Sequence, residues 1–456
     1  TTASRADAGG QEGGLAELDV MRIARRHVSA VVAAAACLAS SVAVAANVAA
    51  SPSTVAAGVG SLVPPDQDSF YRYTGATALA KVPHGTALKE RSVTLGVATV
   101  GTPLPAEQIL YRTTDAVGKP ALSVTTVVLP LTGTASPKVA AYLSFYDALS
   151  TICDPSYTQR GGSPGNANES TAVIEQGLIE ALRASGDIVT VPDFEDERVD
   201  YVAGTESGMS TLDGITATLS ALKLGADTPV GLMGYSGGSI AADWAAELAP
   251  HYVPTMNIVG TAMGGIPVDL AHNLRYINGS ASWSDVMPAS MVGITRSFHI
   301  DFAKYLSPYG KKIVAAESHE CIGEMLGAYP HLTIKQLLKP RYADVYRVPI
   351  FRETLNKLIM GTAPGHPTEP MLMVAGILDG TGDGVMVEQD EQQLAYEYCH
   401  QGVPVDFERL VKLDHDDAGA AFFPQGIAYL NARFLGLPPL DNCKTIPVGN
   451  SLAPLK

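Results

Sequence analysis

Short apolar runs, separated by Gly, Pro and polar residues, recur along the chain and predict β-strands. The first four lie close together, with turn signals such as Gly118-Lys119-Pro120 between them. They cover 93–100, 108–116, 123–130 and 139–145. Closely spaced strands that are joined by turns usually pair in antiparallel fashion. We therefore expect these four runs to form the antiparallel leading edge of a sheet.

After residue 170 the pattern changes to an alternation of strands and helices. Short apolar runs predict buried strands, and longer stretches with apolar residues three or four positions apart predict helices. The strands are expected at 187–192, 229–233, 257–262, 371–377 and 405–411, and the helices at 170–185, 206–224, 239–248, 384–400 and 418–434. This alternation predicts an α/β fold with a mostly parallel sheet flanked by helices. Functional residues should then lie at the carboxyl ends of the strands.

A long segment, 267–349, interrupts the alternation. It contains helical patches and no convincing strand. Because a connection of this length within a compact domain is usually functional, we expect a helical cap, or lid, over the functional site. The core would then consist of 46–266 and 350–456. The alternative is a structural side domain that takes no part in substrate selection.

The N-terminal region carries the pattern of a secretory signal. Segment 21–46 has a basic start, a short Ala-rich apolar stretch and an A-x-A cleavage pattern at 43–45. Such a segment is typical of a secretory signal peptide. We therefore assign 1–45 to an upstream extension and a signal peptide, and expect an extracellular protein. An uncleaved membrane anchor is the alternative, but the dominance of Ala makes the stretch weakly hydrophobic.

Charge and cysteine content narrow the function classes. The formal net charge of −15 disfavours binding to nucleic acid or to anionic membranes through charge. Four cysteines remain after the signal segment, and in an exported chain they predict two disulfides, with three possible connectivities. Because there is no CxxC or His-rich spacing, we expect neither a structural metal nor a cofactor.

A candidate nucleophile stands where a predicted strand meets a predicted helix. The run 229–233 leads into Gly234-Tyr235-Ser236-Gly237-Gly238, and a helical pattern follows. The motif G-x-S-x-G between a strand and a helix is the nucleophile elbow of α/β-hydrolases, which exposes the serine on a sharp turn. A second copy at 161–165 includes Ser163, but it lies in a polar loop without a preceding strand. We therefore predict Ser236 as the nucleophile.

A serine nucleophile needs a base and an acid that orients the base. In α/β-hydrolases these residues follow the serine in the order acid, then histidine. His415 stands in a loop after strand 405–411, whereas His400 ends a predicted helix, so His415 is the expected base. The acid should follow strand 371–377, where both Asp379 and Asp383 qualify. The backbone N–H of Gly237, directly after the nucleophile, should stabilise an oxyanion.

The chain also resembles the secretory lipase family, the lipase A type of α/β-hydrolase of fungi and actinobacteria. The resemblance covers most of the mature chain and is clearest at 191–196, 201–215, 234–250, 260–270, 399–402 and 433–443. In the family pattern the acid lies sixteen residues before the helical cysteine and the base sixteen after it. This spacing implies Asp383 and His415, counted from Cys399. The resemblance further implies the backbone of Asp147 as the second oxyanion donor, and the pairs Cys153–Cys321 and Cys399–Cys443.

Together these features predict a secreted carboxylic ester hydrolase that forms an acyl-enzyme on Ser236. The resemblance points to acylglycerols as substrates. We also expect transient contact with a lipid interface through the cap, and no obligate protein partner. A short-chain carboxylesterase or an acyltransferase would use the same residues. A serine peptidase and a non-catalytic protein with this fold are the remaining alternatives.

Overall fold

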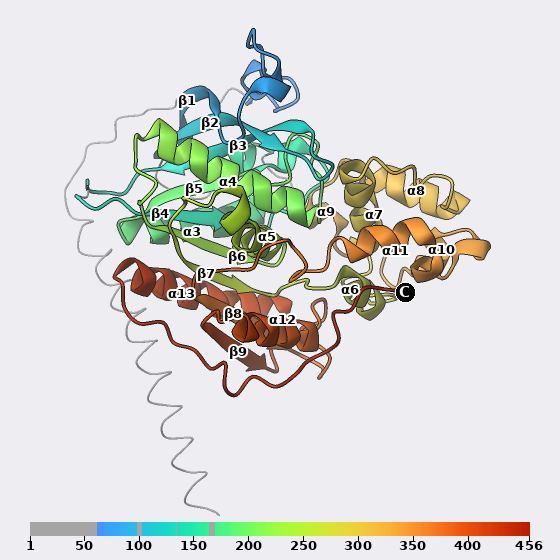
Figure 1. Ribbon diagram of the computed structural model, residues 1–456. Coiled ribbons are helices and arrows are strands. Elements are labelled where there is room, and N and C mark those ends of the chain that lie inside the picture. Colours follow the sequence, from blue (N-terminus) through green and yellow to red (C-terminus); the bar gives the residue numbers. More distant parts are fainter. Residues whose placement is uncertain (1–61, 98–102, 134, 164–168) are drawn as a thin grey trace, which may run out of the picture. The chain divides into compact units, whose positions relative to one another are not determined.

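A nine-stranded sheet lies at the centre of the described chain (Figure 1). The computed structural model describes residues 62–97, 103–133, 135–163 and 169–456, all within the unit Ser61–Lys456. The predicted signal segment therefore lies outside the described residues. The strands are β1 (Ala87–Leu95), β2 (Leu104–Thr114), β3 (Pro120–Val128), β4 (Val139–Leu143), β5 (Ile188–Pro192), β6 (Val230–Tyr235), β7 (Ile258–Gly264), β8 (Met371–Ile377) and β9 (Val405–Val411).

The sheet order is β1-β2-β3-β5-β4-β6-β7-β8-β9. Strands β1, β2, β3 and β5 pair in antiparallel fashion, and from β5 to β9 all pairs are parallel. The expected α/β fold with a mostly parallel sheet is therefore confirmed.

The expectation that the first four strands form an antiparallel edge is wrong for β4. This strand lies in the middle of the sheet, parallel to both β5 and β6. Its five residues are all buried. A strand that is apolar on both faces fits the interior of a parallel sheet, where helices cover both sides, better than a half-exposed edge.

Helices cover the two faces of the sheet through alternating strand residues. Val139, Ala141 and Leu143 of β4 pack in one core with residues of α4 (Gly204–Ala221), α5 (Gly237–Tyr252) and α12 (Glu388–His400). Ala140 and Tyr142 pack in a second core with α3 (Glu169–Ala184) and α13 (His415–Phe434). The period of two along the strand thus decides which helices each side chain meets.

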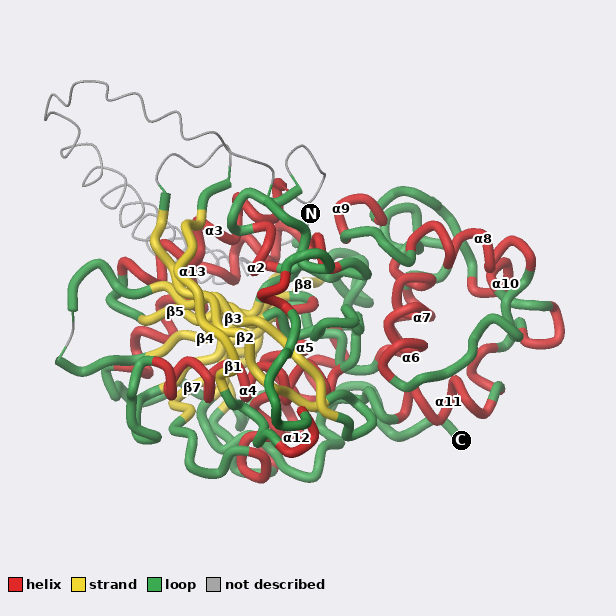
Figure 2. The backbone as a smooth tube through the Cα atoms, turned by 90° about the horizontal axis from the view of Figure 1, so that it is seen from above, coloured by secondary structure: helices red, strands yellow, loops and turns green. Residues whose placement is uncertain are grey.

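A helical insertion separates β7 from β8 and forms the lobe beside the sheet in Figure 2. Its elements are α6 (Leu270–Tyr276), α7 (Val286–Ser297), α8 (Pro308–Glu317), α9 (Ile322–Met325), α10 (Ile334–Leu337), η4 (Pro340–Tyr342), η5 (Val345–Arg347) and α11 (Pro349–Asn356). The shorter elements elsewhere are η1 (Ser69–Tyr71), η2 (Leu79–Lys81), η3 (Thr151–Cys153) and α2 (Pro155–Thr158). In the described part of the chain, no helix combines the length and the apolar character needed to cross a bilayer.

Two disulfides tie the insertion and the C-terminal tail to the core. Cys153 pairs with Cys321, which immediately precedes α9, and Cys399 of α12 pairs with Cys443. The structure thus contains both pairs that the family resemblance implied. The first bond closes a loop between the β4 turn and the insertion, and such cross-links restrict the unfolded chain.

Candidate active site

Ser236 lies at the sharp turn between β6 and α5. Its φ of 54° is in the left-handed region, which non-glycine residues rarely adopt, and strained backbone conformations of this kind cluster at functional sites. A Cβ at Gly234 would collide with the backbone of Gly238, and one at Gly238 would collide with the carbonyl of Leu143. The two glycines of the motif therefore allow β6 and α5 to approach this closely.

Ser236, His415 and Asp383 form a continuous chain of hydrogen bonds, although they are distant in sequence. The Nε2 atom of His415 lies 2.8 Å from the Oγ of Ser236, and its Nδ1 atom lies 2.7 Å from the Oδ2 of Asp383. Asp383 is fully buried and His415 is only 4% exposed. Strands β6, β8 and β9 belong to the parallel half of the sheet, in the order β6-β7-β8-β9, so their carboxyl ends lie along the same edge and bring the three residues together.

The structure distinguishes between the two candidate acids, Asp379 and Asp383. Asp383 accepts hydrogen bonds from the backbone of Val385 and Met386, which leaves its second oxygen for His415. Asp379 is exposed and accepts hydrogen bonds from the backbone of its own turn. Only Asp383 is therefore placed to orient His415.

His415 is the first residue of α13, three positions before the expected helix start and not in a loop. The side chain of Asp414 caps this helix by accepting a hydrogen bond from the backbone of Asp417. This cap was readable from the sequence and explains the earlier start. His400, the rejected candidate, lies at the end of α12 against Tyr396, and Ser163 hydrogen-bonds to the carbonyl of Ile152.

The surroundings of His415 raise its pKa above the ordinary value of 6.5. Burial is the largest single influence and lowers the pKa, but the carboxylates of Asp383, Asp416 and Asp147, with Asp383 foremost, together raise it by more. The hydroxyl of Tyr235 donates a hydrogen bond of 2.6 Å to the carbonyl of His415. The edge of Trp283 also packs against the imidazole ring, with the centroids 5.2 Å apart. The rings of Trp283 and Tyr235, the latter with its centroid 5.0 Å away, and the carboxylate of Asp383 therefore surround the imidazole.

Asp147 lies directly against the turn that carries Ser236. It follows β4, has a φ of 36°, and is so close to Gly237 that a Cβ there would overlap its Oδ1 atom. Neither the backbone N–H of Asp147 nor that of Gly237 is hydrogen-bonded to another described residue. Burial raises the pKa of the Asp147 carboxyl to about 7, an effect that the nearby His415 reduces.

Two buried acids hold the turn that carries Asp147, and sequence reasoning missed both. Glu175 of α3 accepts hydrogen bonds from the Oγ of Ser144 at 2.6 Å and the backbone N–H of Phe145 at 2.9 Å. Glu195 accepts one from the backbone N–H of Ala148 at 3.2 Å. The only sequence signal for Glu175 was an acid on the buried face of a helix. Its partners, 30 residues away, were not predictable from that signal.

Two cavities meet at Ser236. The larger, about 520 Å³, also contains His415 and is lined by the apolar side chains of Phe145, Ile174, Leu326 and Phe423. The smaller, about 40 Å³, runs beneath the insertion and is lined by Ile240, Leu270, Leu274, Ile277 and Val286. The apolar walls on both sides of the serine suit a substrate with hydrocarbon chains.

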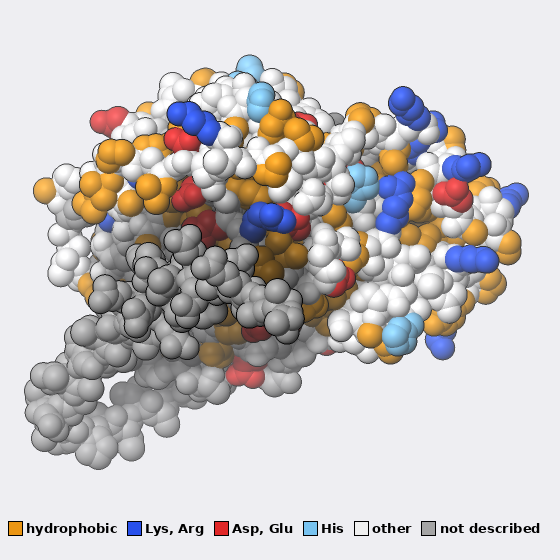
Figure 3. Space-filling model, turned by 90° about the horizontal axis from the view of Figure 1, so that it is seen from below, with side chains coloured by type: hydrophobic (Ala, Val, Ile, Leu, Met, Phe, Trp, Pro, Cys, Tyr) orange, Lys and Arg blue, Asp and Glu red, His pale blue; other side chains and the backbone are white. Residues whose placement is uncertain are grey.

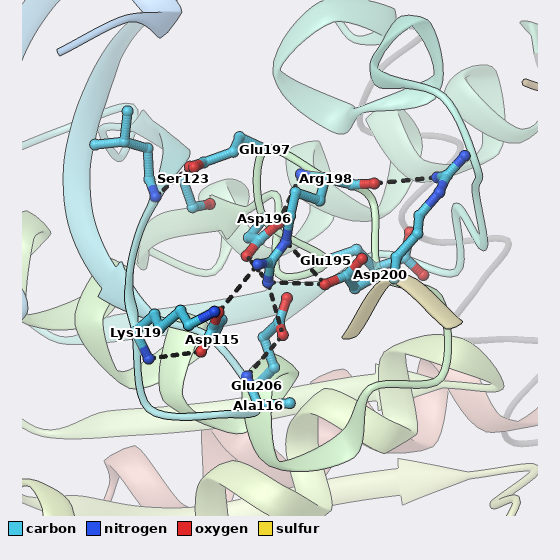
Figure 4. Close-up of polar contacts among 12 residues, drawn as sticks. Asp115, Ala116, Lys119, Ser123, Glu195, Asp196, Glu197, Arg198, Asp200 and Glu206 are labelled. Carbon is cyan, nitrogen blue, oxygen red and sulfur yellow. Dashed lines mark hydrogen bonds and ion pairs between the residues drawn. The ribbon is translucent and has the colours of Figure 1, made fainter. Parts of the chain in front are cut away.

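A polar network supports the loop between β5 and α4, which carries Tyr201 and Val202 to the smaller cavity (Figure 4). Arg198 stands at its centre and forms ion pairs with Asp115, Asp196, Asp200 and Glu206. The carboxylates of Asp196, Asp200 and Glu206 lie close enough together for a cation, but the Nη2 atom of Arg198 is 2.8–3.3 Å from each. The guanidinium therefore supplies the positive charge at this position.

Comparison with known proteins identifies the family. Residues 163–442 match the family described as Secretory lipase. The chain belongs to the secretory lipase family. This confirms the resemblance seen in the sequence, and it makes the protein a lipase-type carboxylic ester hydrolase.

Three similar proteins extend this result. A secreted triacylglycerol lipase of Malassezia globosa is 31% identical over 75% of this chain and 75% of its own. A Mycobacterium tuberculosis protein named a probable inactive lipase is 30% identical over 83% of this chain and 84% of its own. The X-ray structure of Candida antarctica lipase A in its closed state has a TM-score of 0.76 and 25% identity, and the match covers 86% of this chain and 91% of that one.

Proposed function

We propose that this secretory lipase hydrolyses esters through an acyl-enzyme on Ser236. The observation that carries the proposal is the position of His415 between Ser236 and Asp383, with hydrogen bonds of 2.8 Å and 2.7 Å. His415 takes the proton of Ser236 as the serine oxygen attacks the ester carbonyl. Asp383 holds the imidazole in the required tautomer and stabilises the imidazolium that forms.

The oxyanion of the tetrahedral intermediate is stabilised by the backbone N–H groups of Gly237 and Asp147. Both groups lack partners among the described residues, and Asp147 packs against Gly237 beside the nucleophile. His415 then returns its proton to the alcohol oxygen, and the alcohol leaves. Water, activated by His415, attacks the acyl-enzyme and releases the carboxylic acid.

The substrates that we propose are acylglycerols, and the site of action is extracellular. Apolar walls on both sides of Ser236 support a substrate with long chains, and the named triacylglycerol lipase of Malassezia globosa supports the same class. We assign 267–349 to a cap that covers the serine and contacts the lipid interface. Trp283, Val286 and Ile322 of this segment line the cavities at Ser236.

A non-catalytic role is the competing function, because one relative is named a probable inactive lipase. The hydrogen-bonded chain of Ser236, His415 and Asp383 favours hydrolysis in this protein. A fluorophosphonate probe separates the two, since it forms a covalent bond only with an activated serine. We expect one label per chain, located on Ser236 by peptide mass spectrometry. Absence of labelling, or a label on another serine, would contradict the proposal.

A series of p-nitrophenyl esters tests the substrate class. If acylglycerols are the substrates, kcat/KM should rise from the butyrate to the long-chain esters, and emulsified triacylglycerol should be hydrolysed. A preference for the shortest ester without triacylglycerol hydrolysis would indicate a carboxylesterase. An aminoacyl nitroanilide tests the peptidase alternative, and we expect no cleavage.

A further inference from the structure

Positive charge is concentrated in one part of the insertion, although the chain as a whole is acidic. Segment 304–357, here called the basic lobe, has nine Lys and Arg residues against five Asp and Glu residues, while the whole chain has a formal charge of −15. The lobe contains α8, α10 and α11. Figure 3 shows blue Lys and Arg side chains gathered on the lobe at the right, the side on which Figure 1 draws these helices.

The cations of the basic lobe are available to a partner. Seven are exposed, namely Lys304, Lys311, Lys312, Lys335, Arg341, Arg347 and Lys357. Within the described residues only Arg347 of the nine has a carboxylate partner, Asp344. Of the five acids, Glu317 is buried, and burial raises its pKa to about 9, so it is protonated at neutral pH. The lobe is therefore more positive than its composition suggests.

The lobe also presents apolar side chains. Tyr309 at the start of α8 is 47% exposed, and Leu326, just after α9, is 37% exposed. Leu326 lines the larger cavity at Ser236, so the lobe contributes to the wall of the proposed active site. Lys and Arg side chains beside exposed apolar groups fit the boundary between lipid head groups and acyl chains.

We propose that the basic lobe docks the protein on lipid surfaces that carry anionic head groups. This inference rests on the proposed function and names the kind of surface from which substrate would be taken. The net charge of the chain does not prevent such docking, because charges more than about 8 Å apart are largely screened at physiological salt. An anionic surface therefore attracts the lobe that faces it more than it repels the distant acidic core.

The test measures co-sedimentation with phosphatidylcholine vesicles that contain or lack phosphatidylglycerol. Use of the Ser236→Ala background keeps the lipid intact and makes the result independent of catalysis. We expect strong binding to the anionic vesicles and weak binding to the neutral ones. Raising the salt from about 0.1 M to about 1 M, which shortens the Debye length from about 10 Å to about 3 Å, should abolish the difference.

Lys→Glu variants test whether the basic lobe is the surface that binds the vesicles. The triple variant Lys311→Glu/Lys312→Glu/Lys335→Glu should lower the partition coefficient for anionic vesicles by at least about tenfold, since each lysine near an anionic surface contributes substantially to binding. The matched control reverses three exposed lysines elsewhere, Lys81→Glu/Lys119→Glu/Lys444→Glu, and should bind almost as the unmodified protein does. With Ser236 restored, both variants should hydrolyse p-nitrophenyl butyrate normally, which shows that they are folded.

Equal binding to neutral and anionic vesicles would overturn the proposal, as would equal losses in the two triple variants. Light scattering without vesicles tests the alternative that the basic lobe binds the acidic core of a second copy of this chain. A salt-sensitive dimer that disappears in the lobe variant, without binding to vesicles, would assign the lobe to self-association and refute lipid docking. If the vesicle results hold but soluble esters are not hydrolysed, the proposed function fails and the docking surface stands.

Discussion

The carboxylate of Glu175 accepts a hydrogen bond of 2.9 Å from the backbone N–H of Phe145, two residues before Asp147. The same oxygen accepts a second hydrogen bond from the Oγ of Ser144. Glu175 lies on α3, on the opposite face of the sheet from α5, and its carboxylate accepts hydrogen bonds from Tyr142, Ser144 and Phe145 rather than from Ser236. It is therefore a positioning residue for the turn that carries Asp147.

Replacement of Glu175 by Leu should lower kcat with little change in KM. The variant leaves Ser144 and Phe145 without their buried acceptor, so the Asp147 N–H moves away from the oxyanion, and small displacements of this kind can cost up to about 10²-fold. Glu175→Gln retains an acceptor oxygen and should restore most of the activity. Glu180→Gln, on the surface of the same helix, is the control. A purely structural role would lower thermal stability in Glu175→Leu and leave kcat unchanged.

Asp383→Asn should reduce kcat far more than Asp379→Asn. Only Asp383 contacts His415, and loss of the carboxylate that orients a catalytic histidine costs about 10⁴-fold in a related constellation. The carboxylate of Asp379 accepts backbone hydrogen bonds from its own turn instead, so Asp379→Asn should remain close to the native rate. Steady-state kinetics on p-nitrophenyl butyrate provide the comparison. The reverse ranking would transfer the acid role to Asp379.

The rate should fall in acid with a midpoint above pH 6.5. His415 must be neutral to accept the proton of Ser236. Burial lowers its pKa, but the neighbouring carboxylates, Asp383 foremost, together raise it above 6.5. Activity is therefore lost as pH falls through the raised pKa and is regained above it. The measurement is kcat/KM for a soluble ester between about pH 5 and about pH 9. A flat profile, or a midpoint below 6.5, would contradict an imidazole base in this environment.

Glu317→Gln should raise the melting temperature at alkaline pH. Burial raises the pKa of Glu317 from 4.5 to about 9, and neither carboxylate oxygen has a partner among the described residues. The folded state thus retains a proton that the unfolded state loses. The stabilisation is complete below about pH 4.5 and is lost as pH rises through about 9.

Gln does not titrate, so the variant avoids the cost of a buried negative charge at high pH. The melting temperatures of the variant and the native protein should therefore differ more at about pH 9 than at about pH 5. Differential scanning fluorimetry on both proteins gives this comparison, with the exposed Glu353→Gln as control. An equal shift at both pH values would show that the charge of Glu317 is not responsible.

Local patterns predicted the parallel half of the fold well. Strands β8 and β9 have the expected bounds, because each is a compact apolar or alternating run between clear turns. Patterns could not place β4, since an apolar run does not specify its neighbours. Its position depends on pairing with β5 and β6, which are distant in sequence.

The candidate site shows the same division. The G-x-S-x-G motif and the order of acid and histidine follow from local chemistry, and both are visible in the sequence. The choice between Asp379 and Asp383 needed the family spacing, because two acids beside glycines form equally good turns. Glu175 and Glu195 were not predicted, because a buried acid reveals its role only through partners brought close by the tertiary fold.

Hydrolysis of p-nitrophenyl butyrate by Ser236→Ala, beside Ser163→Ala, tests the central claim most directly. Both serines stand in a G-x-S-x-G motif, but only Ser236 contacts His415. We predict that Ser236→Ala loses at least about 10⁴-fold in kcat while Ser163→Ala retains native turnover. Persistent activity in purified, folded Ser236→Ala, or a comparable loss in Ser163→Ala, would contradict the proposed acyl-enzyme on Ser236.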